Sequence, residues 1–114
     1  MNDVTMAALD DALHGLALRQ KAIADNIANV QTPGYLAERV DFETSLRSAL
    51  EGGMRDRVVP TTTRSTDPTR QDGNNVNLDD ETVSALETNL RYQTMVDAVN
   101  AKFRLLRSAI TGGA

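Results

Sequence analysis

Few side chains in this sequence could carry out chemistry, and they form no recognisable pattern. His14 is the only histidine and there is no cysteine, so an ordinary zinc site lacks enough ligands. No serine or threonine lies in a nucleophile-elbow motif that would use His14 as a base. The sequence predicts neither catalytic residues nor metal ligands, and we expect His14 at the surface of a helix.

Asp79, Asp80 and Glu81 form a run of acids that a metal or an acid–base reaction could use. The same run is typical of the first turn of a helix, where the helix dipole favours negative charge. The glycines form neither a GxGxxG motif nor a phosphate-binding loop. We therefore expect no cofactor and no small-molecule substrate, and an enzyme is the least favoured hypothesis.

The most informative segment is residues 26–35, with the sequence NIANVQTPGY. A helix should stop before Pro33, because proline disfavours the helical conformation of the residue before it. Pro33 and Gly34 fit the central positions of a type II turn, and an aromatic anchor with a polar tip follows. The segment predicts either a plain helix stop or a turn that directs the chain back against a neighbour. The predicted turn residues are Asn26, Asn29, Thr32, Pro33, Gly34 and Tyr35.

The element before this turn is predicted to be a helix over residues 5–30, with Thr5 as its N-cap. Its apolar residues are spaced alternately three and four apart, which is typical of a coiled-coil seam, and Gln20 interrupts them once. The seam residues expected at an assembly interface are Leu9, Leu13, Leu16, Ile23, Ile27 and Val30.

A second long helix is predicted over residues 78–110. Asn77 is a favourable N-cap, and Gly112 and Gly113 should end the helix. Apolar residues again recur at helical spacing. Those expected at the interface are Leu86, Leu90, Tyr92, Val96, Val99, Phe103 and Leu106.

The middle of the chain is less regular. A short helix is predicted over about residues 42–50, ended by Gly52 and Gly53. Residues 57–63 could form an extended piece, which Pro60 would restrict to a sheet edge. Residues 64–75 are polar, carry Pro68 and Gly73, and predict a mobile loop.

The predicted fold class is all-α, with the two terminal helices paired as an antiparallel coiled-coil-like core. The chain divides into residues 1–35, 36–76 and 77–114 of a single domain. Only 4% of the residues are aromatic, so the core of one copy should be thin and the apolar seams should need partner subunits. A self-contained two-helix hairpin is the alternative.

Charge and hydropathy exclude some classes of protein. The net charge of −4 gives little electrostatic support for nucleic-acid binding. The first residues are acidic rather than basic, so no cleaved signal peptide is expected. No apolar run is long enough to predict a transmembrane helix.

The segment NIANVQTPGY matches the signature of flagellar rod, hook and hook-associated axial proteins, and residues 22–25 resemble the stretch before that signature. Further segments resemble the proximal-rod branch of the family and differ from the C-terminal helix of its FlgC branch. They are Asp41-Phe42, residues 73–81, residues 89–93, Lys102-Phe103 and residues 106–110.

The resemblance implies a structural subunit of the proximal rod, located in the basal body and exported without a cleaved signal. Implied partners are the rod subunits FlgC and FlgF, FliE, the MS-ring, copies of the chain itself and, in transit, the flagellar export apparatus. Phe42 and Leu46 resemble a short export signal, although core packing of a short helix explains them equally well. The rival hypothesis is a small secreted or adaptor protein that forms a helical hairpin.

Overall fold

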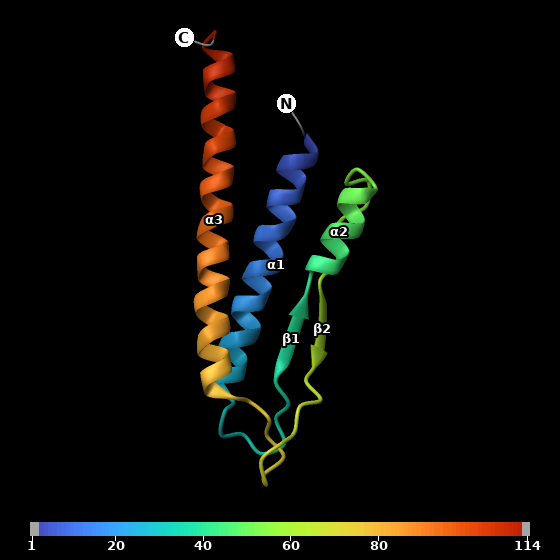
Figure 1. Ribbon diagram of the computed structural model, residues 1–114, viewed down its shortest axis with the longest axis vertical. Helices are drawn as coiled ribbons and strands as arrows, with labels where there is room; N and C mark the ends of the chain where they lie inside the picture. Colours follow the sequence, from blue (N-terminus) through green and yellow to red (C-terminus); the bar gives the residue numbers. More distant parts are fainter. Residues whose placement is uncertain (1–2, 113–114) are drawn as a thin grey trace.

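The structure is a computed structural model that describes residues 3–112. The molecule is elongated, with extents of 65 × 27 × 14 Å. The two long helices, α1 (Asp3–Ala28) and α3 (Leu78–Ile110), lie side by side, as Figure 1 shows. On the other side of α1 lie β1 (Glu38–Asp41), α2 (Glu43–Glu51) and β2 (Thr61–Arg64). α1 is therefore the middle layer of the molecule.

The predicted long helices at the two ends of the chain are confirmed. α1 ends at Ala28, four residues before Thr32, and it already includes Val4. Because the helix extends N-terminally past Thr5, the predicted N-cap at that residue is wrong. Within residues 3–112 no helix combines the length and apolar character that crossing a membrane requires.

The start of α3 is capped as predicted. Asn77 has an extended backbone, and its side chain accepts a hydrogen bond of 3.2 Å from the backbone N–H of Asp80. At the other end Gly112 adopts a positive φ of 84°, which glycine tolerates at a helix C-terminus. Gly113, the other predicted stop residue, lies outside the described residues.

The prediction of an all-α fold is wrong in one respect, because the middle of the chain contains a small sheet. β1 and β2 pair antiparallel, with Glu38 opposite Arg64 and Asp41 opposite Thr61. The β-branched residues Val40 and Thr61–Thr63 favour this pairing, and Pro60 immediately precedes β2, where no ladder hydrogen bond is lost. The expected short helix is confirmed as α2.

The core is thin and centres on Phe42. Ala12, Leu16 and Phe42 form a buried cluster, against which Leu46 and Val58 pack. From α3, Tyr92 and Met95 pack against the same cluster. Phe42 thus joins all three layers of the molecule.

The polar segment predicted as a mobile loop is packed against the rest of the chain. Ser65, Asn74 and Asn75 are buried, although residues 65–76 contain no helix or strand. Their hydrogen bonds, described below, replace the apolar contacts that the segment lacks. The prediction of a free loop over residues 64–75 is therefore wrong.

Candidate functional site

The predicted turn is present. Gly34 has a φ of +75°, and the N–H of Tyr35 donates to the carbonyl oxygen of Thr32 over 3.2 Å. These features define a type II turn with Pro33 and Gly34 at its centre. The side chain and the backbone N–H of Asn29 both donate to the carbonyl oxygen of Asp25, over 2.8 and 3.1 Å, which fixes Asn29 against the last turn of α1.

Asn26 connects the end of α1 to the start of β1. Its side chain is fully buried. The amide accepts from the N–H of Glu38 over 2.8 Å and donates to the carbonyl oxygen of the same residue over 3.0 Å. Asn26 therefore binds the backbone of Glu38 as a neighbouring strand would. A shorter or apolar residue would leave the N–H of Glu38 unpaired and the carbonyl oxygen with only the longer hydrogen bond of 3.3 Å from Arg39.

The same asparagine reaches α3. Its amide also donates to Oε1 of Glu81 over 3.1 Å, and the guanidinium of Arg39 donates to that oxygen over 2.9 Å. Glu81 is buried while the side chain of Arg39 is 43% exposed. A buried carboxylate needs such partners, so α1, β1 and α3 are held together at this point.

Asn74 fixes the turn from the other side. Its amide donates to the carbonyl oxygens of Asn29 and Thr32 over 2.8 and 2.9 Å, and its side-chain oxygen accepts from the N–H of Val76. The N–H of Gly34 donates to the carbonyl oxygen of Asp72 over 2.8 Å. The segment that leads into α3 is therefore bound to the turn that leads out of α1.

Asn75 makes the corresponding contacts with the chain after the turn. Its backbone N–H donates to the carbonyl oxygen of Tyr35, and its side-chain oxygen accepts from the N–H of Ala37 over 2.7 Å. Its amide donates to the carbonyl oxygens of Ser65 and Asp67, each over 3.1 Å. Asn75 thus satisfies backbone groups that no strand pairs.

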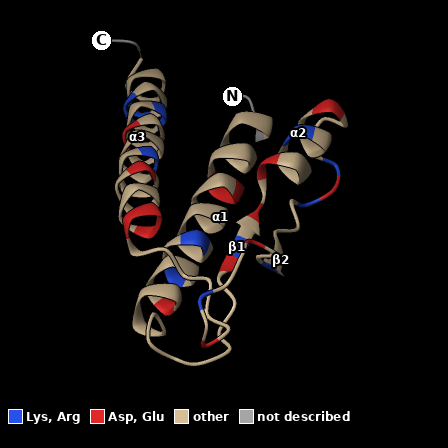
Figure 2. Ribbon diagram, turned by 60° about the horizontal axis from the view of Figure 1, so that its bottom comes forward, with Lys and Arg blue, Asp and Glu red and all other residues tan. Residues whose placement is uncertain are grey.

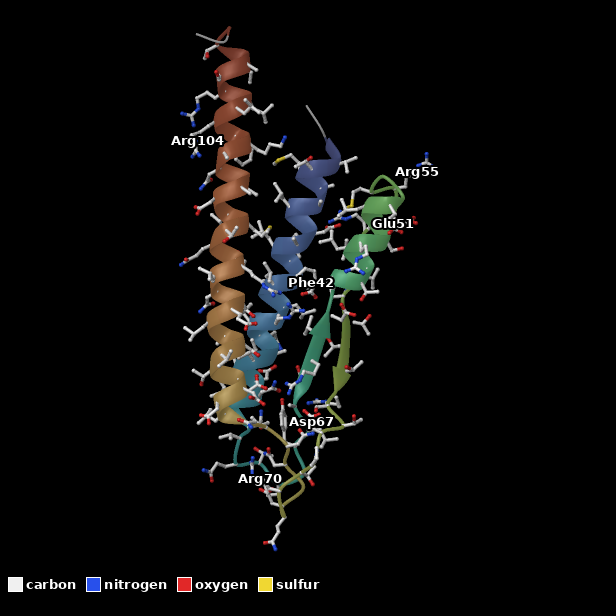
Figure 3. All side chains as sticks on the ribbon, viewed as in Figure 1. Phe42, Glu51, Arg55, Asp67, Arg70 and Arg104 are labelled. Atoms are coloured by element: carbon white, nitrogen blue, oxygen red, sulfur yellow. The ribbon has the colours of Figure 1, made fainter. Side chains whose placement is uncertain are left out.

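Arg70 completes this region from the loops at the base of the molecule (Figure 3). Its guanidinium donates to the carbonyl oxygens of Val30 and Val76. We use the name polar junction for Asn26, Arg39, Arg70, Asn74, Asn75 and Glu81. The polar junction joins the end of α1, the start of β1 and the start of α3, three segments that are distant in sequence.

Sequence reasoning found Asn26 in the polar junction but missed the other five residues. Glu81 was assigned to the helix start with Asp79 and Asp80, yet it alone of the three is buried. Asn74 and Asn75 lay in the supposed mobile loop. A spacing signal does not reveal such residues, because several of their partners lie 38 to 55 residues away.

Phe42, one of the two candidate export residues, is a core residue. Its ring points from the junction of β1 and α2 towards α1 (Figure 3), and the guanidinium of Arg19 stacks 4.9 Å from the ring centroid. Arg19 also binds Glu43 bidentately over 2.8 and 2.6 Å. Leu46 is half-buried beside the cluster. In the folded chain Phe42 is not accessible to a partner.

The predicted assembly residues fall into three groups. Leu16 and Ile23 are buried in α1. Half-buried residues are Leu9, Leu13, Val30, Tyr92, Val96, Val99 and Leu106. The exposed ones are Ile27, Leu86, Leu90 and Phe103, of which Leu86 and Leu90 are 67% and 66% exposed.

Leu86 and Leu90 do not pack against α1 of the same copy. In this half of α3 the buried residues are Glu81 and Thr88, and Asn89 accepts a hydrogen bond of 2.7 Å from the seam residue Gln20. Polar and small residues therefore face α1 here. Leu86 and Leu90 lie on the opposite side, in solvent.

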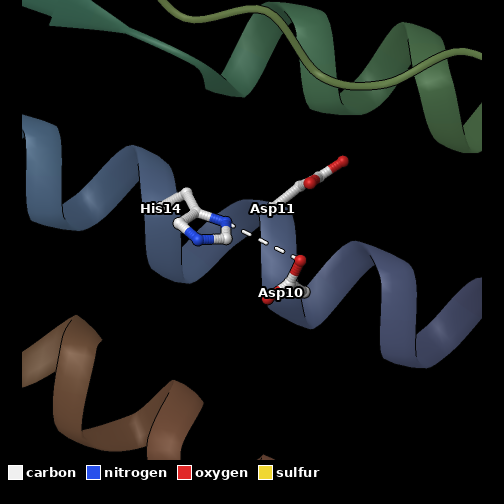
Figure 4. Close-up of side chains that lie close together, drawn as sticks. All are labelled: Asp10, Asp11 and His14. Carbon is white, nitrogen blue, oxygen red and sulfur yellow. Dashed lines mark ion pairs between the residues drawn. The ribbon is translucent and has the colours of Figure 1, made fainter.

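Asp10, Asp11 and His14 lie close together on α1 (Figure 4), with His14 Nδ1 3.7 Å from Asp10 Oδ2. The carboxylate of Asp11 is already occupied. It accepts from the guanidinium of Arg57, the shortest contact being 2.6 Å, and from the N–H of Val58. The hydrogen bond from Arg57 is the main reason that the pKa of Asp11 is lowered. The arrangement is explained by attachment of residues 57–58 to α1, and His14 is exposed as expected.

Comparisons with known proteins agree with the resemblance of the sequence. The family model described as "Flagella basal body rod protein" matches residues 7–35, which span most of α1 and the turn. The flagellar basal body rod protein FlgB of Bacillus subtilis (strain 168) is 31% identical, over 96% of this chain and 95% of its own length.

Two further relatives carry the same name. FlgB of Escherichia coli (strain K12) is 30% identical over 97% of this chain and 96% of its own length. FlgB of Salmonella typhimurium is 27% identical over the same shares. The similarity covers nearly the whole chain and therefore extends beyond α1 and the turn to the central region and α3. The chain belongs to the FlgB family of flagellar basal body rod proteins.

Proposed function

We propose that the protein is a non-enzymatic structural subunit of the proximal rod of the flagellar basal body. It polymerises through α1 and α3 and transmits torque from one subunit to the next. The single observation that carries this proposal, beside the family membership, is the apolar surface that α3 leaves uncovered. Leu78, Val83, Leu86, Leu90, Phe103, Leu105 and Ile110 are each about half exposed or more, between 49% and 83%.

Apolar side chains at this density on one helix favour burial against other chains. Each large aliphatic or aromatic side chain that becomes buried contributes about 1.5–3 kcal/mol, and a monomeric protein rarely leaves a continuous apolar patch in water. In the assembly we propose that α1 and α3 form an antiparallel, coiled-coil-like core. The three segments 1–35, 36–76 and 77–114 act as one domain, because the polar junction holds them to each other.

The partners we propose are copies of this chain, the rod subunits FlgC and FlgF, FliE and the MS-ring. The polar junction supports a mechanical role. Torque applied to α1 or α3 passes to the other elements through hydrogen bonds to buried side chains, which hold these elements in one relative orientation. No step of this function requires catalysis, a cofactor, nucleic acid or a small-molecule substrate.

The subunit is proposed to leave the cytoplasm through the flagellar export apparatus, without a cleaved signal. If Phe42 and Leu46 are the export signal, the apparatus reads them in an unfolded chain, because Phe42 is buried after folding. Two variants separate this role from packing. Phe42→Ala removes the signal and the packing, whereas Gly15→Val removes only the packing. Loss of export in the first variant alone supports the signal, and equal loss or equal retention in both contradicts it.

The assembly role is tested in a strain that lacks this gene and carries a plasmid copy. We expect wild-type protein to restore swimming and complete rods in purified basal bodies. Leu90→Asp should leave the strain non-motile with rods that do not form, because a charge would enter a buried interface. Val59→Asp is the matched control, since Val59 is 69% exposed outside the terminal helices. Complete rods and normal swimming without the gene would overturn the proposal.

A further inference from the structure

Within residues 3–112, α3 carries two separate apolar stripes that are largely exposed, with only Leu106 half-buried among their residues. The first stripe is Val83, Leu86 and Leu90, which are 55%, 67% and 66% exposed. The second stripe is Phe103, Leu106 and Ile110, which line an open groove together with Asn100, Arg104 and Arg107. Phe103 is 52% and Ile110 83% exposed.

The two stripes lie on opposite sides of the helix. Val83 and Ile110 are separated by 27 positions, which is about seven and a half turns at 3.6 residues per turn. The same relation holds approximately for Leu86 and Leu106. Because the stripes point in opposite directions, one partner helix does not cover both of them.

The charges beside the stripes are opposite in sign. Asp79 and Glu87 flank the first stripe, and Lys102 and Arg107 flank the second, so that acids gather near the start of α3 and bases near its end (Figure 2). None of these four residues forms an ion pair with another of residues 3–112. The helix dipole accounts for charges in the first and last turns only, which leaves Glu87 and Lys102 unexplained.

We propose that the second stripe of one copy packs onto the first stripe of a second copy, with Lys102 and Arg107 beside Glu87 and Asp79. This inference rests on the proposed function and specifies its interface. Complementary charge selects this pairing and disfavours either stripe meeting its own kind. If the two α3 helices run in the same direction, the copies are displaced along the helix axis by about 30 Å, the length of 20 residues.

Such a contact can repeat from copy to copy. It joins two different surfaces, so a row of copies keeps one free stripe at each of its two ends. A contact of this type generates open assemblies unless its rotation closes a ring, whereas a surface that pairs with itself produces closed dimers. The arrangement of α3 therefore supplies a repeating contact of the kind that a rod subunit requires.

Cysteine cross-linking in the bacterium tests the pairing, because the chain has no cysteine of its own. The full chain carrying Leu86→Cys and Leu106→Cys replaces the native copy, cells are oxidised briefly, and the products are separated without reductant and detected by an epitope tag. We expect a ladder at multiples of the 12.4 kDa chain. Leu86→Cys and Leu106→Cys chains expressed together should stop at dimers, and each alone should stay monomeric. The control pair Thr62→Cys with Leu106→Cys should form no ladder.

A strong dimer of the Leu86→Cys variant alone would overturn the inference, because it would show that the first stripe pairs with itself. A cross-link to a protein of different mass would also overturn it, since the occupant would not be a second copy. Absence of a ladder in cells that swim would refute this pairing and leave the proposed function intact.

Charge exchange gives a second measurement that uses no cysteine. We expect Glu87→Lys to reduce the diameter of the swimming zone at least twofold and the added Arg107→Glu to restore most of it. A double variant no better than Glu87→Lys alone would contradict the pairing. Complete rods in the deletion strain would instead refute the proposed function.

Discussion

Gly15 of α1 lies directly against the ring of Phe42. A Cβ atom at position 15 would stand 2.5 Å from Cδ1 of that ring, well inside van der Waals contact. Glycine is normally unfavourable within a helix by about 1 kcal/mol relative to alanine. At this position the cost is offset, because the absence of a side chain lets Phe42, the main core residue of the middle segment, reach α1.

Gly15→Ala is therefore predicted to destabilise the protein, opposite to the effect of the same change on an open helix surface. We expect a loss of about 1–3 kcal/mol in the free energy of unfolding, as is usual for overpacking. Urea unfolding followed by circular dichroism measures it. Adding Phe42→Leu should recover part of the loss, because the smaller side chain leaves room for the new methyl group. An unchanged or increased stability of Gly15→Ala would show that the ring does not occupy this place.

A second prediction concerns Asn26. Asn26→Ala removes the partner of the Glu38 N–H, the shorter of two hydrogen bonds to the Glu38 carbonyl oxygen and one partner of Glu81. Buried polar groups that lose their partners cost about 1–3 kcal/mol each, and we expect a total loss of about 2–4 kcal/mol. Asn100→Ala is the control, since Asn100 is exposed on α3 and should lose less than about 0.5 kcal/mol.

Asn26→Asp distinguishes hydrogen bonding from size. The carboxylate keeps the shape of the amide but accepts only, so it could not donate to Glu38 and would face Glu81 with like charge. We expect Asn26→Asp to be at least as destabilised as Asn26→Ala at neutral pH. If the two variants matched wild type in urea unfolding, the assignment of Asn26 as the link between α1 and β1 would be wrong.

The third prediction concerns the buried carboxylate of Glu81. Glu81→Ala leaves Arg39 without its partner, but Arg39 is 43% exposed and water can solvate it. We therefore expect a loss of about 1–3 kcal/mol, below the usual cost of breaking a fully buried pair. Glu81→Gln keeps an acceptor for both Asn26 and Arg39 and should lose less. If Glu81→Gln lost more free energy of unfolding than Glu81→Ala, the charge at this position, rather than the hydrogen bonds, would be important.

The long helices could be predicted because apolar residues at spacings of three and four require only local information. The side of α3 that faces α1 could not be predicted in this way. Val83, Leu86 and Leu90 form one apolar side of this helix, and Tyr92, Met95 and Val99 belong to another. The spacing rule does not rank the two, so it could not show that Leu86 and Leu90 face away from α1 of the same copy.

The polar junction could not be predicted from the sequence, for a different reason. Asn74, Asn75 and Glu81 have the composition of a loop and of a helix start, and burial of such residues depends on partners distant in sequence. By contrast, the turn at Pro33 and Gly34 was predictable, since proline and glycine determine its backbone angles locally. The residues of the turn itself were thus enough to predict it, while the segments that bind the turn could be identified only from the structure.

The fourth prediction is a dependence of stability on pH that arises from Glu43. Hydrogen bonds from Arg19 are the main cause that lowers the pKa of Glu43 from 4.5 to about 2. A carboxyl group whose pKa is depressed in the folded protein stabilises the fold at pH values above 4.5, its pKa in the unfolded chain. This contribution is lost as the pH falls towards 2. Because the side chain of Glu43 is 42% exposed, solvent screening reduces the contribution to about 1 kcal/mol.

Glu43→Gln isolates this contribution, because glutamine does not titrate. The difference in the free energy of unfolding between wild type and Glu43→Gln should be constant at about 1 kcal/mol above pH 5 and shrink between about pH 4.5 and 2. Asp11, whose pKa is also lowered, is unchanged in both proteins and largely cancels in the difference. Arg19→Gln should remove most of the pH dependence of the difference, since it removes the main donor, while the N–H of Phe42 and the guanidinium of Arg91 remain beside Glu43. A difference that grows towards low pH would show that Arg19 does not bind Glu43 in the folded protein.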